Sequence, residues 1–288
     1  DLHSFPTRRS SDLVNNIKAR VNNNIHLFNK NDAQESGFES VLTSYTNTIY
    51  NSSLWLAGEY GNGNLSVAAE KSYDVSSKDF FFGPIGNFDN LPNYQNYDRV
   101  YPITKTDIDQ HNAWYNCVQD PNCDVNINFP NYTIPQYILE WPAHGDVSNG
   151  EDFYLAPFED VDGDGIYNPE NGDYPKIKGD EAVFYVLNDF KTHVASGGAP
   201  LGVEIHVMVY AYESNLEVIN NTVFVNYKVF NRGKVAGFSK LKIGVYTDLD
   251  VDYFTGQDFI GCDTNRNMYY GYTINTPNDT LGEPAQGV

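Results

Sequence analysis

The chain has 288 residues with 38 acidic and 18 basic side chains, which gives it a formal net charge of −20. Such a charge repels nucleic-acid phosphates and anionic lipid headgroups, so it argues against a nucleic-acid partner and against peripheral membrane binding. No apolar run approaches the roughly 18 residues of a membrane span, which argues against membrane insertion. With 22 Tyr and 17 Phe, the chain has enough apolar surface for a packed core, unlike a disordered protein.

Residues 1–13 are either an artefact of different origin from the rest of the chain or a native polar leader, and the first interpretation is favoured. A DNA sequence that resembles a common short-read sequencing adapter encodes all of them when it is read in one frame. We therefore predict that they are an assembly artefact, to be excluded from fold reasoning like a tag or a cloning scar. On this interpretation the native chain starts near Val14, and its true beginning is missing.

Residues 14–145 are predicted to form a loop-rich β region. We expect a strand over residues 65–69 and a short helix over residues 105–116, separated by turn-rich segments. Cys117 and Cys123 lie close enough in the sequence for a disulfide, although two free thiols explain the spacing equally well. The third cysteine, Cys262, is expected to be buried rather than reactive.

The most specific motif lies in residues 146–180, which we predict to be a linker. The run of residues 160–173 has oxygen-bearing side chains at loop positions 1, 3, 5, 9 and 12 and a glycine at position 6. Carboxylates at every second position can curl around a calcium ion, which takes about six to eight oxygen ligands. The predicted ligands are the side chains of Asp160, Asp162, Asp164, Asn168, Asn171 and Asp173 and the backbone carbonyl of Ile166.

This loop differs from an EF-hand at its last position. An EF-hand has a bidentate glutamate at position 12, where this chain has Asn171, and Asp173 could supply the missing carboxylate instead. The difference favours a calcium-ordered linker, as in dockerin-like or thrombospondin-type-3 loops. A solvated acidic turn is the alternative, although three aspartates in five residues repel one another when no cation is bound.

Residues 181–288 have the clearest strand patterns, and we predict a β-sandwich of jelly-roll or immunoglobulin-like type there. Apolar and polar residues alternate, and turn residues separate the segments. The expected strands are residues 182–187, 202–212, 222–230, 240–246 and 268–274. The whole chain is thus predicted to be mostly β, with the calcium-binding loop joining the sandwich to the loop-rich region.

The alternation also predicts which side chains are buried. In residues 202–212, the longest expected strand, the apolar residues at 203, 205, 207 and 209 share one face, and Glu204 and His206 lie on the other. In residues 240–246, three apolar side chains should point inward: Leu241, Ile243 and Val245.

A second, weaker acidic cluster follows residues 240–246. Alternate carboxylates on an extended segment point the same way, which is typical of a cation site or of a plain acidic rim. The cluster lacks the glycine-turn spacing, so both interpretations stay open. Its members are Asp248, Asp250, Asp252, Asp258 and Asp263.

An extracellular hydrolase acting on polysaccharide is one alternative function. Glu204 and His206 share a strand face, and His144 and His193 lie in glycine-flanked loops. Such groups could act as acid and base or hold zinc. However, a hydrogen-bonded pair on a half-buried strand explains Glu204 and His206 without catalysis, and no nucleophile elbow, HExxH motif or phosphate loop supports an enzyme.

Lectin-like, calcium-dependent binding is the other alternative. Exposed aromatic side chains can stack on sugar rings near a calcium ion. Trp141, shortly before the acidic loop, is the best candidate, whereas Trp55 lies in an apolar run and is expected in the core.

Several long segments resemble a family of large secreted proteins of Bacteroidota. The resemblance implies export to the cell surface or medium, and members typically carry a C-terminal type IX secretion sorting domain. The sorting domain is not seen here, so we expect an internal fragment that is truncated at both ends. The matching segments are residues 138–145, 155–175, 196–206, 220–227, 246–250, 260–268 and 284–288.

The leading expectation is a calcium-stabilised, non-catalytic module of a secreted or cell-surface bacterial protein. Its role would be structural or adhesive, with glycans or other surface proteins as partners. Calcium sites of extracellular modules bind at about 10⁻⁴–10⁻³ M, so they fill outside a cell but not in the cytosol.

Overall fold

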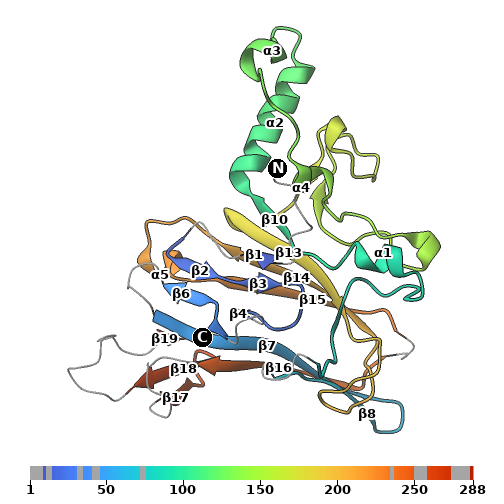
Figure 1. The fold of residues 1–288 in the computed structure, drawn as a ribbon, viewed down its shortest axis with the longest axis vertical. Helices are drawn as coiled ribbons and strands as arrows, with labels where there is room; N and C mark the ends of the chain where they lie inside the picture. The colour runs from blue at the N-terminus through green and yellow to red at the C-terminus, as the bar shows by residue number, and fades with distance from the viewer. Residues whose placement is uncertain are drawn as a thin grey trace.

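The computed structural model describes residues 9–10, 15–30, 35–40, 46–71, 76–233, 237–249, 258–273 and 286–287. It is mostly β, with several antiparallel sheets, which confirms the predicted fold class (Figure 1). The helices are α1 (Leu91–Gln95), α2 (Lys105–Gln119), α3 (Val125–Asn128), α4 (Gln136–Leu139) and α5 (Glu217–Asn220), with 3₁₀ turns η1 (Val147–Asn149) and η2 (Pro169–Asn171). No helix in these ranges is long and apolar enough to cross a membrane.

Two five-stranded sheets form the body of the described structure. The first has the order β10 (Tyr101–Thr104), β13 (Glu181–Asn188), β14 (Val203–Ala211) and β15 (Phe224–Asn231), and β9 (Phe81–Phe82) also pairs with β13. The second has the order β16 (Lys240–Leu249), β7 (Thr46–Tyr60), β6 (Phe38–Ser40) and β2 (Ile17–Ala19), and β8 (Asn64–Ala68) also pairs with β7.

Small sheets complete the described β structure. They pair β1 (Arg9–Ser10) with β3 (Val21–Asn22), β4 (Asn29–Lys30) with β5 (Glu35–Ser36), β11 (Phe158–Glu159) with β12 (Tyr174–Pro175), and β17 (Asp258–Asp263) with β18 (Met268–Thr273) and then β19 (Gln286–Gly287).

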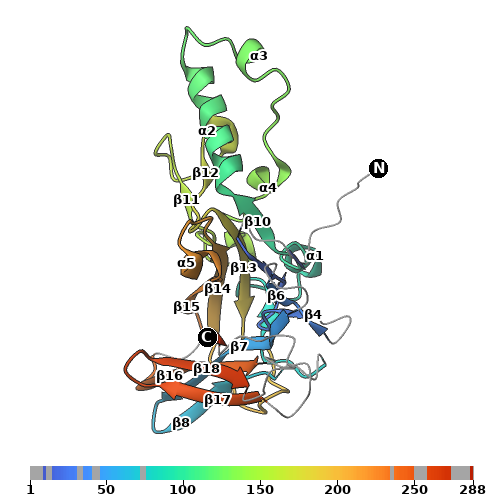
Figure 2. The same ribbon diagram turned by 90° about the vertical axis from the view of Figure 1, so that its left-hand side faces the viewer.

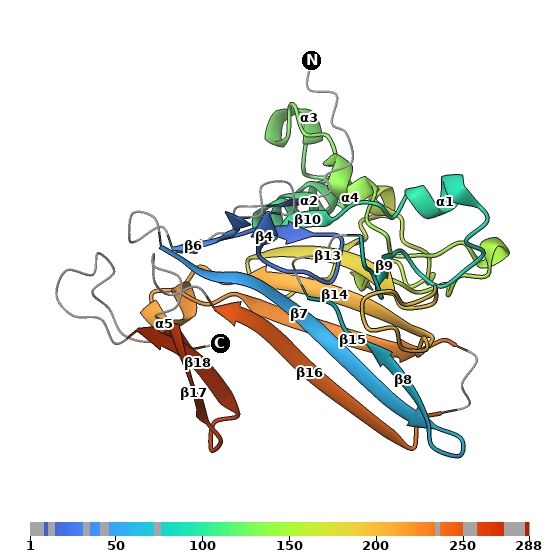
Figure 3. The same ribbon diagram turned by 60° about the horizontal axis from the view of Figure 1, so that its bottom comes forward.

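The main hydrophobic core joins the two large sheets. The alternation predicted for β14 is correct, since Val203, Ile205, Val207 and Val209 are all at most 1% exposed and belong to the same apolar cluster as Leu54 of β7. Each large side chain buried in this way contributes about 1.5–3 kcal/mol. Figure 3 shows β7 and β16 running side by side along one face of the molecule.

The β13–β14 sheet is buried on its second face as well. Phe184 and Met208 point away from the main core into another apolar cluster, which also contains Ile103, Ile138 and Trp141. The segment between β10 and β13 supplies this cover, and Figure 2 shows α2, β11 and β12 gathered at one end of the β13–β15 sheet. Burial on both faces explains why β13 is an almost unbroken apolar run.

Helix α2 agrees with the expected helix over residues 105–116. The Thr104 side chain accepts a hydrogen bond from the Asp107 N–H at 3.1 Å and so caps the helix. At the other end, Cys117 and Cys123 form a disulfide with a Cα–Cα distance of 5.2 Å. The structure thereby decides between the two interpretations of these cysteines. The prediction for Cys262 was wrong, because this thiol is exposed on β17.

The burial predicted for β16 was also wrong. Ile243 is opposite Leu56 and Val245 is opposite Leu54, so both point to the core-facing side of the sheet. Even so, Leu241, Ile243 and Val245 are 42%, 60% and 52% exposed. The reason is position, since β16 is an edge strand and the described part of the opposite sheet does not cover it.

Strand β7 is the longest strand in the described residues, with 15 residues against nine in β14, and no strand was expected there. Polar residues at 51–53 interrupt its apolar pattern. They are nevertheless buried, and Ser53 donates to the Glu70 carbonyl at 3.0 Å.

Both large sheets combine strands that lie far apart in the sequence. Strand β7 pairs with β16, and β13 pairs with β10 and β9. Each of these pairs joins a strand from residues 14–145 to one from residues 181–288. The division of the chain into 14–145, 146–180 and 181–288 stays a prediction about separable parts.

A fragment of residues 181–288 tests that division. We expect it to stay unfolded on its own, because β16 loses β7 as a partner and β13 loses β10. Circular dichroism and a urea titration of the fragment would measure this. A cooperative unfolding transition of the isolated fragment would instead support separate domains.

Candidate metal centre

The acidic loop is the connection of a short β-hairpin. Phe158 pairs with Pro175 and Glu159 pairs with Tyr174, so β11 and β12 bring the two ends of the 160–173 loop together. A loop whose ends are fixed loses less conformational entropy when its side chains are ordered around a ligand.

Three carboxylates converge inside this loop. Asp160, Asp162 and Asp173 each present an oxygen atom, and the three atoms lie within 4.8 Å of one another. It is the only group of three or more potential metal ligands of the His, Cys, Asp and Glu types within the described ranges. Asp173 is fully buried, Asp160 is half-buried and Asp162 is exposed. The site combines one fixed carboxylate with two that solvent can reach.

Backbone N–H groups hold two of these carboxylates in place. Asp173 accepts hydrogen bonds from the N–H of Val161 at 2.7 Å and of Asn168 at 2.8 Å, so it ties both sides of the loop together. Asp160 accepts from Gly163 and Gly165, each at 2.8 Å. Both glycines have positive φ angles, 77° and 81°, which a residue with a Cβ rarely adopts.

Among the described residues, cationic side chains do not neutralise the cluster. In the described part of the chain, no Lys or Arg forms an ion pair with Asp160, Asp162 or Asp173. Three carboxylates within a few ångströms repel one another unless they are protonated or bind a cation. Their oxygen ligands suit a hard cation such as Ca²⁺ or Mg²⁺.

The other predicted ligands have local partners. Asp164 accepts from the Ile166 N–H at 2.7 Å, and Asn168 accepts from the Glu170 N–H at 3.0 Å at the start of η2. Asn171 donates to Asp162 at 3.0 Å, so it lies beside the three gathered carboxylates. The structure brings Asp160, Asp162 and Asp173 together, and ligation of a cation by all seven predicted residues remains a prediction.

Sequence reasoning missed the role of His144, which fastens the loop to the rest of the molecule. Its Nε2 accepts from the Tyr167 N–H at 2.8 Å, and its Nδ1 donates to the Phe153 carbonyl at 3.1 Å. Tyr167 in turn donates to the Ile138 carbonyl at 2.7 Å. At the far side, Gly172 has a φ of 97°, and a Cβ there would lie 2.4 Å from the Tyr115 ring of α2. The loop is therefore docked on both sides.

Glu204 and His206 do lie together, as their shared strand face predicts. His206 Nε2 is 2.8 Å from Glu204 Oε1, and Glu204 Oε2 accepts from the Ile85 N–H at 2.9 Å. Arg232 lies 3.5 Å from Glu204 and pairs with Asp152 at 2.6 Å. Glu204 is fully buried, and these contacts join the sheet to two loops.

His193 belongs to a different place. Its Nδ1 is 2.6 Å from the Val67 carbonyl and its Nε2 is 2.9 Å from the Asp189 carbonyl. Among the described residues, no hydrogen bond or ion pair joins His144 or His193 to Glu204 or His206. The four catalytic candidates therefore do not form one site. Glu204 and His206 form a pair, whereas His144 and His193 each hold backbone groups elsewhere.

Trp141 is unsuited to stacking on a sugar ring. It is 4% exposed, it lies against Phe184, and its indole N–H donates to the Pro157 carbonyl at 3.0 Å. Trp55 is half-buried and stacks on Tyr246 at 5.2 Å between ring centres.

The second acidic cluster is described only in part. Asp250 and Asp252 lie outside the described residues, Asp248 lies on β16 and Asp258 begins β17. Asp263 pairs with the Arg266 guanidinium, and this hydrogen bond lowers the pKa of the Asp263 carboxyl. Asp263 therefore already has a cationic partner.

Comparisons of the chain with protein-family models, with curated proteins and with solved structures found no match.

Replacing Asp173 tests how the loop is held. We expect Asp173→Ala to lower the free energy of unfolding by about 1–3 kcal/mol, because two N–H groups lose their acceptor. Urea unfolding in EDTA would measure this without any contribution from bound metal. Glu170→Ala, an exposed change in the same loop, is the control and should stay within about 0.5 kcal/mol of the parent protein. Equal losses for the two variants would contradict the role given to Asp173.

Proposed function

We propose that this protein is a calcium-stabilised, non-catalytic module of a secreted or cell-surface bacterial protein. The observation that carries the proposal is the convergence of Asp160, Asp162 and Asp173 within 4.8 Å. Calcium would offset two of the three negative charges of these carboxylates and lock the β11–β12 hairpin onto α2. The role of the module would be structural or adhesive, in contact with glycans or other surface proteins.

Two further observations support an extracellular setting. The Cys117–Cys123 disulfide suits an oxidising compartment, since disulfides are rare in the cytosol. A loop with only three gathered carboxylates, two of them open to solvent, also suits a weak site. Extracellular calcium sites bind at about 10⁻⁴–10⁻³ M.

The hydrolase and lectin alternatives have less support. Glu204 binds His206 Nε2, the Ile85 N–H and Arg232, which gives the pair a structural role that needs no substrate. Burial of Trp141 removes the best sugar-stacking candidate. We therefore rank the non-catalytic function first.

Calcium should raise the melting temperature. At 10 mM calcium and the affinity above, binding to the folded state contributes about 1.4–2.7 kcal/mol, or about 3–10 °C for a protein of this size. We expect EDTA to abolish this increase, and magnesium to give a smaller one because it loses its hydration shell reluctantly. Differential scanning calorimetry would measure both effects.

Variants that replace a carboxylate with a neutral amide test whether the calcium response comes from the loop. Asp160→Asn combined with Asp162→Asn should remove the calcium response, whereas Glu170→Gln in the same loop should keep it. A melting temperature that is the same in calcium and in EDTA would contradict the proposal. So would a calcium response that survives in the double variant.

A further inference from the structure

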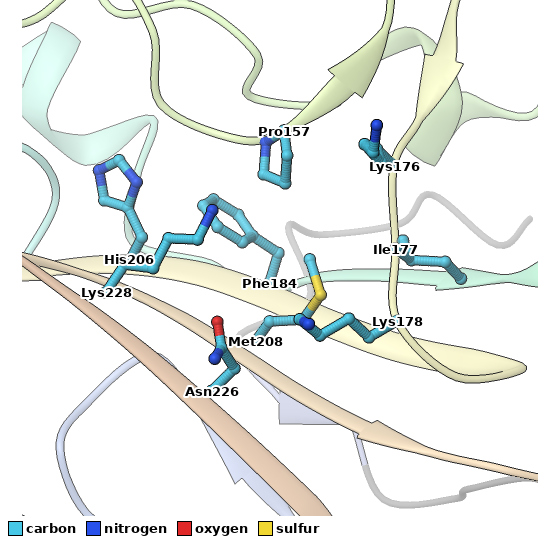
Figure 4. Close-up of a pocket in the computed structure, with 9 residues that line it drawn as sticks. All are labelled: Pro157, Lys176, Ile177, Lys178, Phe184, His206, Met208, Asn226 and Lys228. Carbon is cyan, nitrogen blue, oxygen red and sulfur yellow. The ribbon is translucent and has the colours of Figure 1, made fainter.

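A second site lies at the base of the same hairpin. A pocket of about 390 Å³ opens on the outer face of the β13–β15 sheet, where the cover of that face ends (Figure 4). This volume is within the range of about 300–1,000 Å³ that small-molecule sites have. The residues that line it are Pro157, Lys176, Ile177, Lys178, Phe184, His206, Met208, Asn226 and Lys228.

The sheet register builds the floor of this pocket. Phe184, Met208 and Asn226 lie opposite one another across β13, β14 and β15. The next row ends with His206 opposite Lys228. Cross-strand neighbours on one face are about 5 Å apart, so the floor is apolar at one side and cationic at the other. Phe184 and Met208 are almost fully buried, which fixes their positions.

The wall of the pocket comes from the two segments that flank the β11–β12 hairpin. Pro157 precedes β11 and Lys176 follows β12, and the Lys176 N–H donates to the Pro157 carbonyl at 3.0 Å. The Trp141 indole donates to the same carbonyl, also at 3.0 Å. Hydrogen bonds to the Pro157 carbonyl thus attach the wall to the apolar cluster that covers the sheet.

Positive charge gathers at this pocket, although the protein has a net charge of −20. Three lysines line it, and within the described part of the chain Lys176 alone has an acidic partner, Glu159 at 2.6 Å. Lys178 and Lys228 form no ion pair with any described residue. Figure 4 shows their side chains extending over the pocket from opposite sides.

His206 adds a polar atom to the cationic side. Its Nε2 is occupied by Glu204 at 2.8 Å. Its Nδ1 has no hydrogen-bond partner within the described ranges, and the ring lines the pocket beside Lys228. Together with the Asn226 side chain, the site offers hydrogen-bonding groups and two ammonium groups above an apolar floor.

We propose that this pocket binds a small organic acid, with its carboxylate between Lys178 and Lys228 and its flat apolar body against Pro157, Ile177 and the exposed edge of Met208. Charge-assisted hydrogen bonds to the ammonium groups would orient the carboxylate. The apolar floor would exclude a fully hydrated inorganic anion. The inference goes beyond the proposed calcium function and does not depend on it, because protein side chains alone define the pocket.

Ligand-observed NMR titration with naphthoate, and with naphthamide as its neutral counterpart, tests the proposal. We expect saturable binding of naphthoate and at least roughly tenfold weaker binding of naphthamide, since one charge-assisted contact accounts for about that factor. Binding should also weaken as salt is added, because the lysines are solvent-accessible. No naphthoate binding, or equal binding of the two compounds, would overturn the proposal.

Matched variants assign the binding to this pocket. Lys178→Gln combined with Lys228→Gln should weaken naphthoate binding at least roughly tenfold. Lys105→Gln combined with Lys240→Gln is the control, because it changes the net charge equally at exposed lysines that pair with Asp109 and Glu59. Equal affinities for the two double variants would overturn the assignment. A thermal melt of each variant shows that both are folded.

Discussion

Hydrogen bonds from backbone N–H groups to buried carboxylates hold the loops of this protein in place. Asp79 and Asp189 are both fully buried. Asp79 accepts from the N–H of Ala69 and Ala195, and Asp189 accepts from the N–H of Leu201 and Val203 at 2.6 and 2.7 Å. A buried carboxylate without such partners costs several kcal/mol. Burial raises the pKa of Asp189, and the N–H donors act in the opposite direction. Some acidic residues of this chain are therefore buried and hold loops in place through hydrogen bonds.

Asp173 also holds a loop in place by accepting hydrogen bonds from backbone N–H groups, but its neighbours differ from those of Asp79 and Asp189. Asp79 and Asp189 lie near His193, whose nitrogens are 3.9 and 3.6 Å from their carboxylates. Asp173 instead has Asp160 and Asp162 as neighbours. The fold thus brings three negative charges together at one place in the described chain, and that arrangement is the basis for a cation there.

Much of the fold could be predicted because the apolar patterns of strands, alternating or continuous, are local. Strands β13, β14, β15 and β18 all lie close to their expected positions. Strand β7 could not be predicted, since its buried Asn51 and Ser53 resemble loop residues until their partners are known. The exposure of Ile243 depends on what the opposite sheet covers, which is a property of the assembled fold.

The candidate site was predictable to a similar extent. Spacing indicated Asp160 and Asp162, because a loop ligand motif is local, and Asp173 was a candidate because position 12 has Asn171 in place of a carboxylate. The role of His144 in holding the loop was not predictable from the sequence, since its partners Phe153 and Tyr167 are brought to it by the folded hairpin. The lysine pocket also needs the structure, because it combines three strands with the hairpin base.

The two proposed sites share one structural unit. The β11–β12 hairpin carries the acidic loop at its tip, and the residues at its base form the wall of the lysine pocket. A cation at the tip would neutralise carboxylates, and a carboxylate at the base would neutralise lysines. The hairpin thus has the three gathered carboxylates at its tip and the lysine pocket at its base.

Anomalous diffraction from a crystal grown in calcium is the most direct measurement of the central claim. The account predicts a calcium peak about 2.3–2.6 Å from oxygen atoms of Asp160, Asp162 and Asp173. A crystal with no peak at these carboxylates, or with calcium bound only elsewhere on the chain, would contradict it.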